Sequence, residues 1–303
     1  MKKVLITAPY FQLVLDRYRG VFSDHNIEIL VPEVKERMSE EELLPLMGDI
    51  DGILCGDDRI TEKVLAAAPK LKVIVKWGTG TDSIDKEAAA RRGIPVRNTP
   101  NAFTEPVADT VMSYILAFAR STFDLDRKIR GGVWEKKLGK ALNECTVGVI
   151  GIGNIGSAVI KRAQAFGARI LGNDIKEKSF DFMVSLKELL KESDFVVLAC
   201  DLNPTSFHIM NAETLSLMKP TAYLINCARG PLVEEKALIN ALDSKKIAGV
   251  GLDVFESEPL AANHPFTKME NVILSPHNSN SSEKAWQRVH ENSINILIEE
   301  LLK

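Results

Sequence analysis

Short apolar segments alternate along this chain with amphipathic segments of helical period. Five apolar runs in the first third each predict a strand, at residues 4–6, 27–31, 52–54, 73–75 and 95–97. A second series predicts six more strands, at residues 147–150, 169–172, 195–199, 222–226, 249–254 and 272–274. Because strands that alternate with crossover helices form parallel sheets, the pattern predicts the α/β class with doubly wound parallel sheets.

Helix start signals lie between the strands of the first series. Ser39 and Glu42 form a capping box before an apolar pair. Thr61 precedes a second helical segment, and either Ser83 or Asp85 precedes a third.

A longer apolar helix is predicted over residues 105–123, followed by a polar, lysine-rich stretch over 124–143. A last helix is predicted over residues 282–302. The apolar face of the 105–123 helix fits either the core of its domain or an interface with a second copy. This face consists of Val107, Val111, Met112, Ile115 and Ala119.

Composition places the chain among globular proteins with about two domains. Its 303 residues are about twice the usual domain length. The content of 45% hydrophobic and 26% charged residues excludes the disordered and fibrous classes. A net charge of −3 gives no indication of a nucleic-acid partner. The apolar run over 106–119 is too short to span a membrane and contains Asp109, so it predicts a buried helix.

The cysteines show no spacing typical of metal ligands, so no metal site is expected. The first residues lack the long apolar core of a signal peptide. We therefore expect free thiols and a cytoplasmic location. The four cysteines are Cys55, Cys145, Cys200 and Cys227.

A glycine pattern typical of dinucleotide-binding turns follows the strand at 147–150. Gly151 permits a tight turn, Gly153 lets the backbone approach a pyrophosphate, and Gly156 lets the next helix pack on the strand. Asp174 ends the following strand, where a carboxylate accepts hydrogen bonds from ribose hydroxyls and repels a 2′-phosphate. The pattern therefore favours NAD over NADP. Methyltransferases that bind S-adenosylmethionine share much of it, so this motif alone leaves that class open.

Three polar residues stand just past apolar strands of the second series: Arg229, Glu258 and His277. In a parallel sheet, all three lie at the carboxyl edge, where ligands bind. Reduction of a ketone by hydride needs a proton donor, and histidine is suited to this near neutral pH. A carboxylate orients the imidazole, and a guanidinium binds a substrate carboxylate. The remaining histidines lack this placement and are expected to be structural: His25, His208, His264 and His290.

Together these segments resemble the NAD-dependent, D-isomer-specific 2-hydroxyacid dehydrogenases of the phosphoglycerate dehydrogenase type. The matching segments cover nearly the whole chain: KWGTGTDSID at 76–85, NTP at 98–100, VAD at 107–109, GIGNIG at 151–156, LMKP at 217–220, NCARG at 226–230, LDVF at 252–255, EP at 258–259 and SPH at 275–277.

The resemblance implies roles for individual residues. Arg229 would bind the substrate carboxylate and carbonyl, Glu258 would orient the catalytic His277, and Asp253 would meet the nicotinamide carboxamide. The implied substrate-binding residues are Gly78, Thr79 and Gly80 through their backbone N–H groups, with Arg229 and His277. The implied NAD-binding residues are Gly151, Gly153, Asn154, Ile155, Gly156, Asp174, Cys200, Cys227, Ala228, Asp253 and His277.

The resemblance also implies an architecture and a partner. A Rossmann-type NAD-binding domain over residues 100–282 would be inserted into a flavodoxin-like substrate domain over 1–99 and 283–303. Two copies would form a homodimer through the NAD-binding domain. We expect no nucleic-acid or membrane partner.

The implied activity is interconversion of a D-2-hydroxy acid and its 2-keto acid by hydride transfer with NAD. Two alternatives share the fold: reduction of glyoxylate or hydroxypyruvate, and NAD sensing by a non-catalytic, corepressor-like binding protein. The joint presence of Arg229, Glu258 and His277 argues against the second alternative.

Three departures from the family pattern concern loops near the expected substrate. Residues 101–103 read Asn-Ala-Phe and residues 278–280 read Asn-Ser-Asn, where the family often has glycine. After the strand at 52–54, Asp57 and Asp58 stand where phosphoglycerate enzymes carry a basic residue. Two carboxylates repel a phosphate unless Arg59 or Lys76 compensates, so 3-phosphoglycerate is doubtful as the substrate. The family's long members carry a regulatory domain after the last helix, and none is expected here.

Overall fold

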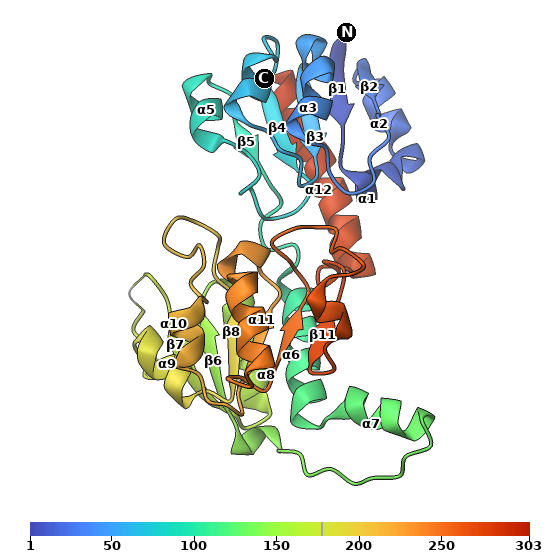
Figure 1. Cartoon of the computed structure of the whole chain (residues 1–303). Helices are drawn as coiled ribbons and strands as arrows, with labels where there is room; N and C mark the ends of the chain where they lie inside the picture. The colour runs from blue at the N-terminus through green and yellow to red at the C-terminus, as the bar shows by residue number, and fades with distance from the viewer. Residues whose placement is uncertain (177) are drawn as a thin grey trace. The chain divides into compact units, whose positions relative to one another are not determined.

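The computed structural model describes residues 1–176 and 178–303. This part of the chain forms two compact units, each described below by itself (Figure 1). Unit 1 comprises Met1–Phe103 and Ser282–Lys303, and unit 2 comprises Thr104–Ser281. The predicted domain boundaries lie within a few residues of these divisions, and the functional labels of the two domains stay predictions.

Unit 1 is built on a five-stranded parallel sheet of order β2-β1-β3-β4-β5. Its strands are β1 Lys2–Ile6, β2 Ile27–Leu30, β3 Gly52–Cys55, β4 Val73–Lys76 and β5 Val96–Arg97. The central strands β3 and β4 are buried on both faces, as expected for apolar runs in a parallel sheet.

Three helices of unit 1 begin at the side-chain caps that the sequence predicts. Ser39 and Glu42 form the predicted capping box, and the side chains of Thr61 and Asp85 accept hydrogen bonds from the first turns of their helices. The helices are α1 Pro9–Gln12, α2 Arg19–Asp24, α3 Glu40–Leu43, α4 Glu62–Ala66, α5 Lys86–Arg91 and α12 Glu283–Leu302. The last of these packs on β3, with Leu297 and Leu301 over Gly52.

Unit 2 is built on a six-stranded parallel sheet of order β11-β10-β9-β8-β6-β7. Its strands are β6 Thr146–Ile150, β7 Arg169–Asn173, β8 Phe195–Leu198, β9 Tyr223–Asn226, β10 Gly249–Leu252 and β11 Val272–Leu274. The predicted class, two parallel-sheet α/β domains, is thereby confirmed. The order reverses between β6 and β8, and this switch point is where α/β sheets bind ligands.

The prediction of one long helix over 105–123 is wrong in one respect, because this segment forms parts of two helices. Ser121 has a φ of 52°, in the left-handed region, and this residue separates α6 Thr104–Ala119 from α7 Thr122–Arg130. The start of the stretch predicted as polar is therefore helical. The other helices of unit 2 are α8 Asn154–Ala165, α9 Leu186–Glu192, α10 Ala212–Ser216 and α11 Glu235–Asp243.

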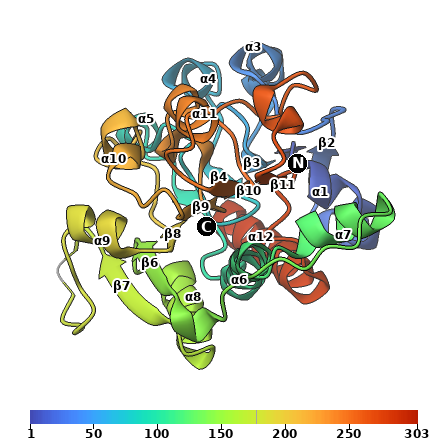
Figure 2. The ribbon, with the colours of Figure 1, turned by 60° about the horizontal axis from the view of Figure 1, so that its bottom comes forward.

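The apolar face of α6 lies in the core of unit 2. Val111 and Ile115 are fully buried, and α6 packs against α8 and β9 (Figure 2). Of the two alternatives left by the sequence, the structure thus supports the core rather than an interface. Within the described part of the chain, no helix is long and apolar enough to cross a membrane.

Candidate active site

Three neighbouring strands of unit 2 bring Arg229, Glu258 and His277 to one edge of the sheet. Arg229 follows β9, Glu258 follows β10, and His277 follows β11. Because β9, β10 and β11 are adjacent and parallel, their carboxyl ends meet at this edge.

His277 and Glu258 form a direct pair. Nδ1 of His277 lies 2.9 Å from Oε2 of Glu258, and both side chains are about one-fifth exposed. The other oxygen of Glu258 accepts the N–H of Phe255 at 2.9 Å. A carboxylate accepts only, so the pairing places the imidazole hydrogen on Nδ1 and leaves Nε2 as the atom for proton exchange.

Asp253 holds the turn that carries His277. Its buried carboxylate accepts hydrogen bonds from the hydroxyl of Ser275 and from the N–H groups of Asn278 and Ser279. Its carbonyl oxygen accepts the N–H of His277 at 2.7 Å. His277 has a φ of 51°, an uncommon backbone conformation that these contacts stabilise. The implied contact of Asp253 with a nicotinamide carboxamide stays a prediction.

The Arg229 turn is held by a residue that the sequence did not single out. The buried side chain of Asn226 donates to the carbonyl of Arg229 at 2.8 Å and accepts the N–H of Ala228 at 3.0 Å. Gly230 then lies against the backbone of Phe255, so closely that a Cβ atom would overlap its carbonyl group. The turn after β9 and the loop after β10 are therefore in backbone contact.

The glycine turn after β6 has the shape that a dinucleotide requires. Gly151 has a φ of 92° and lies against the backbone of Cys200 at the end of β8, which places the turn at the switch point of the sheet. A Cβ atom on Gly156 would overlap the carbonyl of Gly151, so only glycine lets α8 approach. Beside Gly153 there is open space.

Helix α8 begins at Asn154, directly after its N-cap residue Gly153, which has no side chain to cap it. Its first N–H groups and its dipole therefore attract an anion. The open space at Gly153 and the start of this helix fit a pyrophosphate group. The remaining implied residue of the turn, Ile155, lies in the first turn of the same helix.

Asp174 follows β7 and stands beside the same turn. Its carboxylate accepts the N–H groups of Ile152 at 2.7 Å and Lys176 at 2.8 Å. Burial alone would raise the pKa of Asp174, but these N–H donors outweigh it and hold the pKa below its usual range. A carboxylate that is charged at neutral pH suits ribose hydroxyls and disfavours a 2′-phosphate.

The two cysteines implied in NAD binding are thiols at neutral pH. Burial raises the pKa of Cys200 to about 11, and burial also raises the pKa of Cys227 well above its ordinary value. Neither is therefore a thiolate nucleophile, and any role is limited to neutral contacts.

The Gly78–Gly80 loop belongs to unit 1. Gly78 has a φ of 122°, and its carbonyl accepts the backbone N–H and the hydroxyl of Thr99. The side chain of Asn98 donates to the carbonyl of Thr79 at 2.6 Å. In the part of the chain that the structure describes, the N–H groups of residues 78–80 donate to no protein acceptor, which leaves three donors for an anion.

The two carboxylates after β3 have different environments. Asp58 is buried and accepts hydrogen bonds from Thr7, Met38 and Gly56, so it holds the loop together. Burial raises the pKa of Asp58 despite these donors. Asp57 is 39% exposed and lies 3.1 Å from the buried ammonium of Lys76. Lys76 therefore carries a charge that Asp57 already balances.

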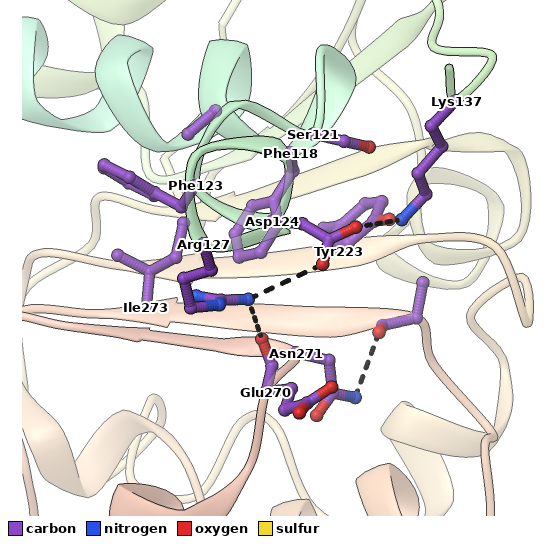
Figure 3. Close-up of a pocket in the computed structure, with 12 residues that line it drawn as sticks. Phe118, Ser121, Phe123, Asp124, Arg127, Lys137, Tyr223, Glu270, Asn271 and Ile273 are labelled. Atoms are coloured by element: carbon purple, nitrogen blue, oxygen red, sulfur yellow. Dashed lines mark hydrogen bonds and ion pairs between the residues drawn. The ribbon is translucent and has the colours of Figure 1, made fainter. Parts of the chain in front are cut away.

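The pocket drawn in Figure 3 is separate from these groups. It has a volume of about 220 Å³ and lies between α7 and the amino ends of β9 and β11, at the edge of the sheet opposite Arg229. Arg127 donates to the carbonyl of Glu270 there at 3.2 Å, and Lys137 pairs with Asp124 at 3.0 Å. Among the described residues, no group of histidine, cysteine, aspartate or glutamate could hold a metal ion.

Comparison with known proteins assigns this chain to a family. Residues 112–279 match the family model described as D-isomer specific 2-hydroxyacid dehydrogenase, NAD binding domain. A glyoxylate reductase from Thermofilum pendens is 41% identical over 280 residues, covering 87% of this chain and 82% of that protein. A D-3-phosphoglycerate dehydrogenase from Methanocaldococcus jannaschii is 38% identical over 295 residues, covering 94% of this chain and 55% of that protein.

Solved structures agree with these matches. The crystal structure of a D-lactate dehydrogenase from Aquifex aeolicus, complexed with NAD and lactic acid, superposes with a TM-score of 0.88 at 28% identity. The match covers 97% of this chain and 94% of that one. The dehydrogenase interpretation with NAD as cofactor thus holds over the methyltransferase and NAD-sensing alternatives. The chain belongs to the D-isomer specific 2-hydroxyacid dehydrogenase family, whose NAD-dependent members interconvert 2-hydroxy acids and 2-keto acids.

Proposed function

We propose that this dehydrogenase acts on a short, unphosphorylated 2-keto acid of the glyoxylate or hydroxypyruvate type, with Arg229, Glu258 and His277 as its catalytic residues. The observation that carries the proposal is the 2.9 Å pair between Glu258 and His277, on the sheet edge that Arg229 shares. The named relatives include several glyoxylate reductases, which supports this substrate class.

NAD fits unit 2, with the pyrophosphate at Gly153 and the start of α8 and the ribose at Asp174. When bound, the cofactor supplies or accepts the hydride. His277 gives the proton to the developing alkoxide from Nε2 in the direction of reduction, and takes it back in oxidation. Glu258 stabilises the charged imidazolium through Nδ1 and keeps the ring oriented.

The substrate carboxylate is assigned to two donor sets. The planar guanidinium of Arg229 can bind a carboxylate through two parallel hydrogen bonds and polarise the adjacent carbonyl. The N–H groups of Gly78, Thr79 and Gly80 form the second set. Their neighbouring carbonyls are already engaged within unit 1, which leaves the N–H side of the loop for an anion.

The preference for an unphosphorylated substrate rests on the charges beside this loop. Asp57 neutralises Lys76, and a Cβ atom on Gly78 would lie 3.7 Å from the Lys76 ammonium. A phosphate near this loop would meet this neutral ion pair rather than an uncompensated cation, so the pair offers the phosphate no net Coulomb attraction.

A substrate panel tests the proposal. NADH oxidation is followed with glyoxylate, hydroxypyruvate, pyruvate and 3-phosphohydroxypyruvate, and we expect the highest kcat/KM on the first two. Asp57→Asn should raise kcat/KM for the phosphorylated substrate relative to glyoxylate. Asp49→Asn, at an exposed residue paired with Lys70, is the matched control. A wild-type preference for 3-phosphohydroxypyruvate would overturn the substrate assignment.

We also propose a homodimer formed through α7 and the segment that follows it. This arm exposes five large apolar side chains: Phe123, Ile129, Val133, Trp134 and Leu138. Trp134 is 88% exposed and Leu138 is fully exposed, although the arm is fastened by the Lys137–Asp124 pair (Figure 3). Exposed apolar side chains of this kind fit the same side chains of a second copy.

Light scattering tests the dimer. Trp134→Glu combined with Leu138→Glu should halve the particle mass, whereas Leu13→Glu, at an exposed leucine of unit 1, should not. A monomeric wild type would overturn this proposal.

We propose a cytoplasmic location as well. All four cysteines are free thiols, which supports it. Cell fractionation followed by detection of this protein in each fraction tests the location.

A further inference from the structure

Charged side chains surround the contact between the turn after β9, which carries Arg229, and the loop after β10, which carries Glu258. These two segments are called the Arg229 turn and the Glu258 loop below. Gly230 lies against the peptide that joins Phe255 to Glu256. Three residues that are not among the proposed catalytic residues form hydrogen bonds beside this contact: Glu235, His208 and Glu256.

Glu235 holds the peptide from one side. It is the first residue of α11, and its Oε1 accepts the backbone N–H of Glu256 at 2.8 Å. Its Oε2 lies 3.4 Å from Nε2 of His264. Nδ1 of His264 accepts the N–H of Phe266, so the ring hydrogen is on Nε2 and points to Glu235. The carboxylate of Glu235 is therefore itself oriented.

His208 contacts the side chain of Glu256, whose backbone N–H is bound by Glu235. Its Nε2 lies 2.6 Å from Oε1 of Glu256, while its backbone N–H donates to the carbonyl of Pro231 at 2.9 Å. One residue thus connects the Glu258 loop to the turn that begins at Arg229. His208 has a φ of 50°, a conformation that persists in non-glycine residues only where surrounding contacts stabilise it.

The position of the 255–256 peptide affects the pair that Glu258 forms with His277. Glu256 precedes Glu258 by two residues, and Glu258 binds both the N–H of Phe255 and Nδ1 of His277. A shift of the 255–256 peptide would move the Glu258 carboxylate, and through Gly230 it would also move the Arg229 turn.

We propose that Glu235 and His208 are positioning residues. By fixing the 255–256 peptide, they keep the side chains of Glu258 and Arg229 at constant positions relative to each other. The proposal rests on the catalytic roles proposed above. Neither residue touches the reacting atoms, so its effect appears in kcat through the geometry of the His277 pair. Displacements of about 1 Å in a catalytic group cost up to about 100-fold in rate.

Three variants test Glu235 by steady-state kinetics with glyoxylate. Glu235→Ala should lower kcat about 10-fold with little change in the KM for NADH. Glu235→Gln should recover most of this loss, because its amide oxygen still accepts the Glu256 N–H. Glu234→Ala is the matched control, since the adjacent Glu234 side chain caps no helix and should leave kcat unchanged.

A double-mutant cycle separates positioning from a general loss of stability. In the Glu258→Gln background, Glu235→Ala should cause little further loss of kcat, because the pair that it positions is already disabled. The same factor in both backgrounds would overturn the proposal. If Glu235→Ala does not fold, His208→Ala and His208→Gln take its place in the same cycle. If Glu258→Gln alone retains wild-type kcat, the proposed catalytic pair fails and the positioning role fails with it.

Discussion

The indole N–H of Trp77 donates a hydrogen bond to Nδ1 of His290 across 3.0 Å. The bond joins the residue that precedes Gly78 to helix α12, which is 213 residues away in sequence. His290 is 5% exposed and lies among the rings of Phe11, Trp77 and Trp286. Helix α12 thus supports the end of β4 from which the Gly78–Gly80 loop begins.

This contact predicts a pH-dependent stability. Burial, assisted by the charge of Arg17, lowers the pKa of His290 to about 4. An unfolded histidine titrates near 6.5, so the unfolded state binds more protons between these values. The stabilising contribution is present above pH 6.5 and is lost as the pH falls towards 4. His290→Gln removes this titration while its amide oxygen can still accept from Trp77.

Urea unfolding at pH 7 and pH 5 measures the effect. The wild type should lose about 1–2 kcal/mol more than His290→Gln over this interval. Because the other titrating groups are common to both proteins, their contribution cancels in the comparison. Equal losses would show that folding does not lower the pKa of His290.

A second prediction concerns Gly230. Alanine at this position would overlap the carbonyl of Phe255, which is backbone and cannot rotate away. Gly230→Ala should therefore lower the free energy of unfolding by about 1–3 kcal/mol and lower kcat as the two loops separate. Thermal unfolding and steady-state kinetics measure the two effects. Wild-type values for both would mean that the loops adjust without cost.

Gly153 predicts the opposite behaviour and serves as the matched comparison. Its φ of −82° suits alanine, and a Cβ atom there would meet no protein atom. Gly153→Ala should leave the melting temperature of the free protein unchanged and weaken NADH binding, because the methyl group would occupy the space assigned to the pyrophosphate. Fluorescence titration with NADH measures the affinity. Unchanged affinity would move the pyrophosphate away from Gly153.

Features that depend on neighbouring residues in the sequence could be predicted, and the glycines of the turn after β6 are an example. The roles of Gly151 and Gly156 follow from a local motif, since strand, turn and helix are contiguous, and the structure has the geometry that the motif requires. Strand positions and the Ser39 and Thr61 caps were predictable for the same reason. The break at Ser121 was not, because the apolar period continues through it.

The supporting contacts of the candidate site could not be predicted from local patterns. Asp253 binds the turn at Asn278, and Gly230 meets Phe255, only because separate loops converge at one sheet edge. His208 was expected to be structural on the ground that it follows no strand, yet the fold places it beside Glu256. Contacts between loops that are distant in sequence leave no periodic pattern along the chain.

The last prediction addresses the proton transfer itself. His277→Ala removes the proposed acid, so kcat for glyoxylate reduction should fall about 100-fold to 10,000-fold, which is the range for general acid–base catalysis. Glu258→Gln keeps the shape of the pair but cannot stabilise an imidazolium, so it should lower kcat by a smaller factor. NADH affinity, measured by fluorescence titration, should change little in both. Because His277 and Glu258 act as one unit, the double variant should be no slower than His277→Ala alone. A double variant that multiplies the two single losses would mean that the 2.9 Å pair does not act as a unit in proton transfer.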